Sequence, residues 1–213
     1  MTDSRPPATD PAVRALLVDL GQVLVRFDHD RTLRALEAAS GIPVETLRPF
    51  VFGPLERELD LGRLTTEEFF RSVERSAGIP RIPDDVWIPA WRDIFEPDLS
   101  ALHSLASIRR GVARILVSNT NPLHWEGVLR VFDVVSLVDR TVLSFETGTA
   151  KPEPAIFEAA MKAAGVAPGE ALFADDRGEY VAAARTLGIP GFVVSGPGVF
   201  ERSLIRFGLL EPV

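Results

Sequence analysis

Short, nearly continuous apolar runs recur along the chain and predict buried strands. The run at residues 13–20, VRALLVDL, ends in an acid and is typical of a strand buried on both faces of a parallel sheet. Similar runs predict further strands at residues 113–117, 134–138, 171–174 and 191–194. Helical spacing of apolar residues separates most of them, at residues 98–109, 154–164 and 179–187. This alternation predicts an α/β fold, with a Rossmann-like parallel sheet flanked by helices.

Residues 28–96 break the alternation and predict an inserted, all-helical cap domain. A helix is expected over residues 31–39, and another begins at Thr65, which is spaced from Glu68 as in a capping box. We therefore expect residues 28–96 to form the cap, and residues 1–27 and 97–213 to form the α/β core domain. The large aromatic residues of the insertion are expected in its own core: Phe69, Phe70, Trp87 and Trp91. Three of its charged residues are expected to be solvated, with the active site as the less favoured alternative location: Glu56, Arg57 and Arg63.

Composition excludes several classes of protein. The chain has 213 residues and a net charge of −7, which argues against broad binding to duplex DNA. It has no cysteine, so disulfides, thiolate zinc sites and cysteine nucleophiles are excluded. It lacks an apolar run of the roughly 18 residues that a membrane-spanning helix needs, and the proline-containing N-terminus reads as a flexible lead-in. We expect a cytoplasmic monomer or homodimer with no nucleic-acid or membrane partner.

Polar residues stand where the predicted strands end. Asp19 follows the first strand, Ser118 and Asn119 follow the second, and the Asp175–Asp176 pair follows the run at residues 171–174. Because ligands of open α/β sheets bind at the carboxyl ends of the strands, we expect these side chains at one rim. Lys151, in a loop before a predicted helix, is expected at the same rim.

Three carboxylates at one rim require a cation. Two of them about 4 Å apart repel by about 4 kcal/mol at an effective dielectric constant near 20, and this repulsion raises their pKa values. Oxygen ligands together with water favour Mg²⁺ over a transition metal. Mg²⁺ beside Lys151 forms a site for an anion, most simply a phosphate, and Asp19 is then a candidate nucleophile.

Four segments carry a resemblance to a known family. In chain order, LLVDLGQVLV, LVSNTN, AKPEP and LFADDRGEYVAAARTLG resemble the four motifs of the haloacid dehalogenase (HAD) superfamily. The likeness covers about residues 13–27 and 97–195, and LDLGRLTTEEFF resembles the cap of the helical-cap (C1) subgroup. The combination is most similar to phosphatases of sugar phosphates, including glucose-1-phosphate phosphatases. The resemblance implies a phosphatase that hydrolyses a small phosphorylated metabolite through an aspartyl-phosphate.

The resemblance also implies roles for the residues that handle the phosphoryl group. Asp19 would attack phosphorus and carry the phosphoryl group. Ser118, helped by Asn119, would hydrogen-bond a phosphoryl oxygen, and Lys151 would neutralise charge between that group and Asp19. Positioned hydroxyl and ammonium groups stabilise the charge that spreads over a transferring phosphoryl group.

A second set of residues would hold the metal. The resemblance implies Mg²⁺ ligands at Asp19, the backbone carbonyl of Gly21 and Asp176, with Asp175 beside them as a ligand or as a holder of water. The ion would neutralise charge and act as a template for the substrate.

The first motif departs from the family pattern. Phosphatases of this superfamily usually read DxD, and the second Asp is the general acid and base, whereas this chain has Gly21 there. Three explanations are open: a substrate with a good leaving group, a substitute group such as Asp28, His29 or His124, or a weak or inactive relative. Tyr180 also stands where many relatives have Asn.

Two other functions compete with the phosphatase. A 2-haloacid dehalogenase on the same scaffold would use Asp19 to attack carbon and would need no metal. A phosphate-binding or regulatory relative would keep the pocket without turnover, as Gly21 permits. The Asp175–Asp176 pair disfavours the dehalogenase, because additional carboxylates repel a carboxylate substrate.

Overall fold

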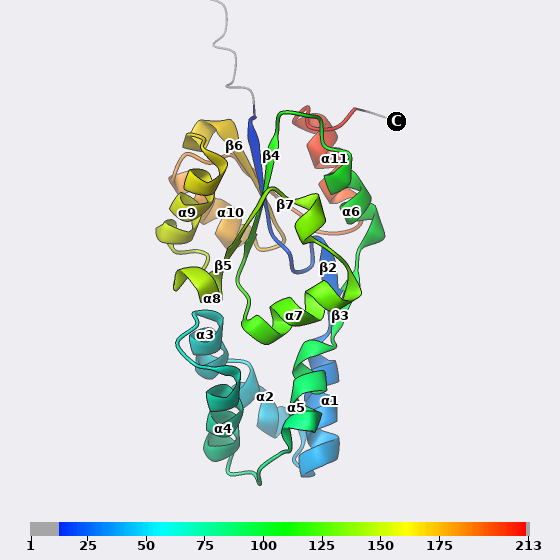
Figure 1. Cartoon of the computed structure of the whole chain (residues 1–213), viewed down its shortest axis with the longest axis vertical. Helices are drawn as coiled ribbons and strands as arrows, with labels where there is room; N and C mark the ends of the chain where they lie inside the picture. Colours follow the sequence, from blue (N-terminus) through cyan, green and yellow to red (C-terminus); the bar gives the residue numbers. More distant parts are fainter. Residues whose placement is uncertain (1–12, 212–213) are drawn as a thin grey trace, which may run out of the picture.

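A five-stranded parallel sheet forms the centre of the molecule. The computed structural model describes residues 13–211. The strand order is β5-β4-β1-β6-β7, and each neighbouring pair is parallel (Figure 1). The strands are β1 (Ala15–Val18), β4 (Ala113–Ser118), β5 (Arg140–Leu143), β6 (Ala171–Asp175) and β7 (Gly191–Val193). The central strand β1 lies between β4 and β6, so the strands that precede most candidate site residues are neighbours.

Both faces of the sheet are covered by helices, as the apolar runs predict. Along β1, Leu16 and Val18 pack in one hydrophobic cluster and Leu17 packs in another, because successive side chains point to opposite faces. The first cluster contains residues of α6 (Leu99–Ala106) and α11 (Val199–Arg206). The second contains residues of α9 (Pro154–Ala164) and α10 (Gly178–Thr186). Figure 1 shows the two pairs of helices on opposite sides of the strands.

The prediction of a strand at residues 134–138 is wrong. This segment forms a short 3₁₀ helix, Val135–Leu137, in which the backbone N–H of Ser136 donates to Asp133 and Val135 is exposed. The edge strand β5 comes next, and its first residue, Arg140, is exposed. An edge strand buries fewer side chains than a central one, so its sequence, RTVL, has a weaker apolar signal than the run before it.

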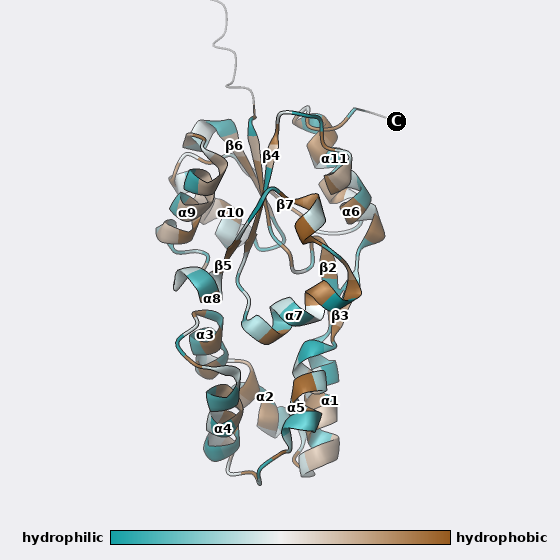
Figure 2. Cartoon of the chain, in the orientation of Figure 1, coloured by the Kyte–Doolittle hydropathy of each residue, from teal (hydrophilic) through white to brown (hydrophobic). Residues whose placement is uncertain are grey.

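A short antiparallel ribbon joins the core to the helical insertion. Strands β2 (Val25–Phe27) and β3 (Phe95–Pro97) pair with Phe27 opposite Phe95. The sequence predicted no strand within residues 28–96, so the start of β3 corrects that expectation. A three-residue strand is too short to show a period, and β3 ends in proline. In this ribbon, which Figure 2 shows between the two parts, hydrophobic Phe27 and Phe95 are adjacent to the exposed, charged Arg26 and Glu96.

The insertion is helical and has its own core. Its helices are α1 (His29–Ser40), α2 (Val44–Val51), α3 (Pro54–Asp60), α4 (Thr66–Ala77) and α5 (Asp84–Arg92). We call α1–α5 the helical cap. The capping box predicted at the start of α4 is confirmed, with Thr65 and Glu68 bonded to each other's backbone N–H. The four aromatic residues predicted in the cap core are all buried.

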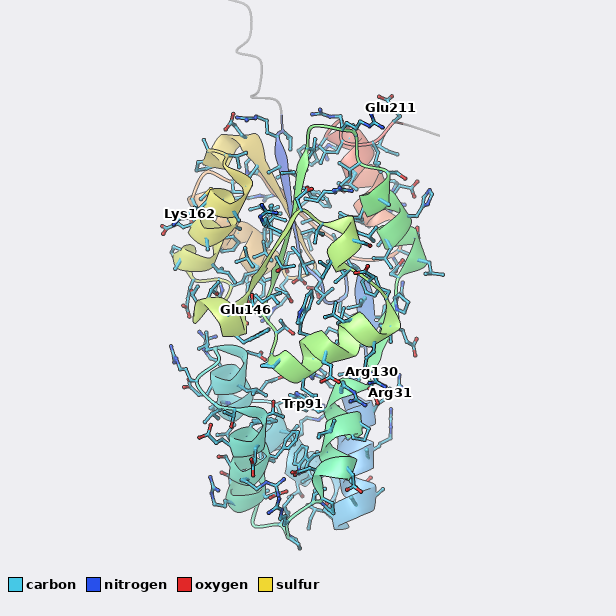
Figure 3. All side chains as sticks on the ribbon, in the orientation of Figure 1. Arg31, Trp91, Arg130, Glu146, Lys162 and Glu211 are labelled. Carbon is cyan, nitrogen blue, oxygen red and sulfur yellow. The ribbon has the colours of Figure 1, made fainter. Side chains whose placement is uncertain are left out.

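Helix α7 (Pro122–Val131) connects the cap to the sheet. The indole Nε1 of Trp91, on α5, donates to Asn121 at the N-terminus of α7, over 3.2 Å. The Trp91 ring also stacks on His124 of α7, with 4.5 Å between ring centroids. Figure 3 shows Trp91 at this junction, below α7. The cap is therefore tied to the core by α7 as well as by the β2–β3 ribbon.

The predicted N-terminal lead-in lies outside the described residues. Within residues 13–211, none of the helices has both the length and the apolar character required to cross a bilayer.

Candidate active site

The polar residues predicted at the strand ends do converge. Asp19 follows β1, Ser118 ends β4 and Asp175 ends β6. Figure 1 shows these carboxyl ends directed toward the helical cap. A cavity of about 170 Å³ lies there. Six of the seven residues predicted for the site line it: Asp19, Gly21, Ser118, Asn119, Lys151 and Asp176. The seventh, Asp175, is fully buried beside them.

Lys151 is the buried cation of the site. Its Nζ lies 2.5 Å from Oδ1 of Asp19 and 2.7 Å from Oδ2 of Asp175, and only 2% of the residue is exposed. Asn119 holds its loop, because its Oδ1 accepts from the backbone N–H of Lys151 and its Nδ2 donates to the Lys151 carbonyl. The ring of Tyr180 packs 5.4 Å from the ammonium group. The lysine is thus fixed by backbone, amide and aromatic contacts before any ligand binds.

Negative charge exceeds positive charge at this point. Carboxylate oxygens of Asp19, Asp175 and Asp176 lie within 4.8 Å of one another, with Lys151 as the cation between two of them. Burial, with the charge of Asp175, raises the pKa of Asp19 to about 7 against the lowering effect of Lys151. Burial disfavours the charged form of Lys151, but the neighbouring Asp19 and Asp175 carboxylates outweigh it and raise the lysine pKa. The net negative charge of these carboxylates would therefore stabilise a further cation beside them.

The two residues of the Asp175–Asp176 pair have different surroundings. Asp175 accepts from Lys151 through one oxygen and from the backbone N–H of Arg177 through the other, at 2.8 Å. Asp176 faces the cavity and is half-buried, and burial with the charge of Asp175 raises its pKa. Because both oxygens of Asp175 are occupied, Asp176 is the better placed of the two to bind a metal ion.

A side chain at Gly21, in the turn after β1, would require the Phe27 ring to move. A Cβ atom built on Gly21 would lie 2.8 Å from Cε1 of Phe27, well inside van der Waals contact. The turn is closed by the backbone N–H of Gln22, which donates to the carbonyl of Val25 at 2.6 Å. Gln22 has a φ of 55°, in the left-handed region that is unusual for a residue other than glycine. The Phe27 ring thus fills the position from which a second acid would project.

The helical cap contributes two acids to the site, of which the sequence analysis considered only Glu56, as the less favoured alternative. Glu56 and Asp60, four residues apart on α3, line the same cavity as Asp19. The expectation that Glu56 is solvated is wrong: it is half-buried, and burial together with the charge of Asp60 raises its pKa to about 8. Their i, i+4 spacing places both side chains on one face of a helix, but it does not show that this face lies against the active site. Arg57 and Arg63 are exposed, as expected.

Asn121 links the cap acids to the core. Its Oδ1 accepts from Trp91 Nε1 and from the backbone N–H of His124, so its Nδ2 is the donor toward Asp60 Oδ1 at 2.9 Å and His124 Nδ1 at 3.0 Å. The Nδ1 of His124 therefore accepts, and the proton of this imidazole lies on Nε2. Burial raises the pKa of Asp60 to about 6, although the Asn121 bond and Arg57 act against it.

The substitute groups suggested for the missing acid lie at different places. Asp28 caps α1 and pairs with Arg34 on the surface. His29 lines the cavity between the rings of Phe27 and Phe52, and burial lowers its pKa to about 4. His124 also lines the cavity, and burial lowers its pKa to about 3. Both histidines are neutral at pH 7.

The burial of Glu56 predicts a pH-dependent effect on stability. The folded chain holds this proton up to about pH 8, whereas an unfolded chain releases it near the ordinary value of 4.5. The folded state then binds more protons, so its free energy of unfolding falls as pH rises between these values, by up to about 1.4 kcal/mol per pH unit. Glu56→Gln has no proton to release at this position, so its free energy of unfolding does not fall for this reason. Its stability relative to wild type should therefore increase from pH 5 to pH 8. Urea unfolding of the metal-free proteins measures the free energy of unfolding at each pH. A difference between variant and wild type that does not change with pH would contradict the burial of Glu56.

Comparison with known proteins identifies a family and several relatives. The sequence pattern of the haloacid dehalogenase-like hydrolases matches residues 13–188. A D-ribitol-5-phosphate phosphatase of Bacteroides thetaiotaomicron is 28% identical over 188 residues, which are 84% of this chain and 91% of that protein. A phosphatase of Mycobacterium tuberculosis is 25% identical over 218 residues, covering 92% of this chain and 93% of that one.

Solved structures show the same architecture. An HAD family enzyme of B. thetaiotaomicron, crystallised with magnesium and inorganic phosphate, superposes with a TM-score of 0.74 at 29% identity and covers 85% of this chain and 93% of its own. An HAD-like family hydrolase from Porphyromonas gingivalis has a TM-score of 0.78 at 25% identity, covering 94% and 100%. The L-2-haloacid dehalogenase of Xanthobacter autotrophicus, 18% identical with a TM-score of 0.63 and coverage of 94% and 85%, shares the fold.

Proposed function

The chain belongs to the haloacid dehalogenase-like hydrolases, and on that premise we propose that it is a magnesium-dependent phosphatase of a small phosphorylated metabolite, with sugar phosphates as the substrate class. One observation carries the proposal: Asp19 stands at the carboxyl end of the central strand, 2.5 Å from the Lys151 ammonium and within 4.8 Å of two further carboxylates. This arrangement binds a phosphoryl group and presents a nucleophile to it. Relatives named as phosphatases support the proposal.

The donor set fits Mg²⁺. Its ligands would be Asp19, Asp176 and the backbone carbonyl of Gly21, with Asp175 buried beside them and holding Lys151 in place. Three clustered carboxylates and one lysine leave net negative charge, which an oxygen-binding divalent cation compensates. When bound, Mg²⁺ supplies charge neutralisation for the phosphoryl oxygens. The relative crystallised with magnesium and inorganic phosphate supports this ion.

The protein's own groups carry out the phosphoryl transfer. A carboxylate oxygen of Asp19 attacks phosphorus, and the phosphoryl group moves to it as the bond to the substrate oxygen breaks. Lys151 offsets the charge of the phosphoryl oxygens, and the buried hydroxyl of Ser118 donates a hydrogen bond to one of them. Asn119 positions the lysine through its two bonds to the backbone of that residue. Water then hydrolyses the aspartyl-phosphate and restores Asp19.

The cavity supports a small, polar substrate. Its volume of about 170 Å³ is below the roughly 300–1,000 Å³ of pockets for drug-sized ligands. The cap side of the cavity presents the carboxyl groups of Glu56 and Asp60, which suit substrate hydroxyl groups. We propose that residues 28–96 act as a cap that closes over the core, residues 1–27 and 97–213, and excludes water. The expected monomer or homodimer and the cytoplasmic location stay predictions.

The charge of the site favours phosphatase over dehalogenase chemistry. A 2-haloacid carries a carboxylate, which Asp175 and Asp176 would repel beside Asp19. A phosphate ester brings equal or greater negative charge, but it shares the divalent cation that these acids bind. The structural likeness to the haloacid dehalogenase concerns the fold alone.

Metal removal tests the proposed function. We expect phosphate release from at least one sugar or sugar-alcohol phosphate when Mg²⁺ is present, with ribitol 5-phosphate included in the panel. Chelation by EDTA should lower the rate by about 10³-fold or more, because the ion supplies several kcal/mol of charge stabilisation, and added Mg²⁺ should restore it. A malachite-green assay measures phosphate. Activity that survives EDTA, metal-independent chloride release from 2-chloropropionate, or a stoichiometric phosphoenzyme without turnover would contradict the proposal.

A further inference from the structure

The proposed reaction needs a proton donor that the first motif does not contain. A leaving alkoxide requires a proton, and the water that attacks the aspartyl-phosphate must lose one. Gly21 has no side chain, and the Phe27 ring lies where a side chain at that position would project. In this conformation of Phe27, the turn therefore supplies no acid to the site. The group that exchanges protons with the substrate must come from elsewhere around the cavity.

Most titratable groups around the cavity are unsuitable at neutral pH. Lys151 is held between Asp19 and Asp175. The hydroxyl of Tyr180 accepts from Arg177 at 2.7 Å, and burial raises its pKa further above neutrality, so it does not readily release its own proton. His29 and His124 are neutral, so neither donates as an imidazolium ion. The Nε2 of His124 is buried without a hydrogen-bond partner in the described chain, and its Nδ1 is occupied by Asn121.

Glu56 differs from all of these groups. It lies on α3 of the cap and lines the cavity that Asp19 and Ser118 line from the core. Only burial and the charge of Asp60 act on its pKa, and no hydrogen bond does. Asp60 is itself held by Asn121, at 2.9 Å. A pKa raised to about 8 favours the protonated carboxylic acid at neutral pH, and Glu56 lines the same cavity as the nucleophile Asp19.

We propose that Glu56 is the general acid and base of the phosphatase reaction, taking the place that the acid after Asp19 has in other members of the family. This assignment rests on the proposed function. Asp60 is a positioning residue, because its negative charge favours the protonated form of Glu56 and its bond to Asn121 connects α3 to the core. Closure of the cap would then deliver the proton donor together with the walls that exclude water.

Glu56 donates a proton in the first half-reaction and recovers one in the second. In the first, Asp19 bonds to phosphorus, the bond between phosphorus and the ester oxygen breaks, and the leaving oxygen takes the proton of Glu56 to form an alcohol. In the second, the Glu56 carboxylate takes a proton from water as the water oxygen bonds to phosphorus. The acyl-phosphate bond then breaks, Asp19 is regenerated and phosphate leaves. The net reaction consumes one water molecule and needs no other reactant.

The test compares two leaving groups in Glu56→Gln and a matched control. Gln has nearly the same shape and no acid proton, and Glu58→Gln makes the same change on α3 at a residue that pairs with exposed Arg63. Substrates are the best alkyl phosphate of the panel and 4-nitrophenyl phosphate, whose leaving group needs no protonation. Circular dichroism checks that each variant folds. Glu56→Asp, which keeps a carboxyl group, serves as a second variant.

Glu56→Gln should lower kcat for the alkyl phosphate by about 10²–10⁴-fold. With 4-nitrophenyl phosphate, it should release one nitrophenol per site in a rapid burst and then turn over slowly, while an acid-stable phosphoenzyme accumulates. Glu58→Gln should match wild type, and Glu56→Asp should lie between. Absence of the nitrophenol burst, a change in KM alone, or normal turnover by Glu56→Gln overturns this role only. Absence of magnesium-dependent phosphate release by wild type overturns the proposed function as well.

Discussion

Asp19→Asn is expected to reduce phosphate release by at least about 10⁴-fold, because an amide oxygen does not form the phosphoryl intermediate. Asn keeps the size of Asp19 and can still accept from Lys151 Nζ, which lies 2.5 Å from Oδ1 in wild type. The loss would therefore concern the chemical step rather than the shape of the site. Stopped assays of phosphate, with acid quenching to detect the phosphoenzyme, should show neither turnover nor intermediate.

Stability separates this loss from misfolding. Removing one of three clustered carboxylates relieves repulsion, while Asp175 remains 2.7 Å from Lys151 and keeps the lysine paired. The metal-free variant should consequently have a Tm no lower than wild type. Asp85→Asn, the same change at an exposed position on α5, is the matched control and should keep full activity. Substantial activity in folded Asp19→Asn would remove Asp19 as the nucleophile.

Lys151→Met is expected to lower both activity and stability. Loss of one preorganised positive group typically costs about 10²–10³-fold in kcat. The methionine keeps an unbranched apolar side chain at this position, but it leaves Asp19 and Asp175 without their cation. Removing one partner of a buried ion pair costs about 3–5 kcal/mol of unfolding free energy. Kinetics of phosphate release and urea unfolding measure the two effects.

The pH dependence of stability shows whether the loss in Lys151→Met comes from the unpaired carboxylates. Without Lys151, the buried carboxylates hold protons in the folded state more strongly than in the unfolded state. Stability then falls as pH rises, so Lys151→Met should lose more relative to wild type at pH 8 than at pH 5. Lys162→Met, on the exposed side of α9 where Figure 3 shows Lys162 at the surface, should change neither quantity. Full activity in Lys151→Met would contradict its role at the phosphoryl group.

Local sequence signals predicted the core because they report burial within a few residues. The run at residues 13–20 contains β1, whose four residues are all buried. Helix α9 begins at Pro154 and ends before Gly165, as its spacing and its glycine predicted. The signals failed for the edge strand β5 and for β3, where only three or four residues pair and few of them are buried.

The sequence alone determined which polar residues meet at the sheet edge. Parallel strands bring their carboxyl ends together, so Asp19, Ser118 and Asp175 had to become neighbours once the strands were identified. Which residues face them from the cap was decided only by tertiary structure. The position of Glu56 depends on how α3 packs over the core, through contacts such as Asn121 with Asp60 that join residues 61 positions apart. Such contacts leave no local pattern, and they also decide whether a carboxyl group is charged.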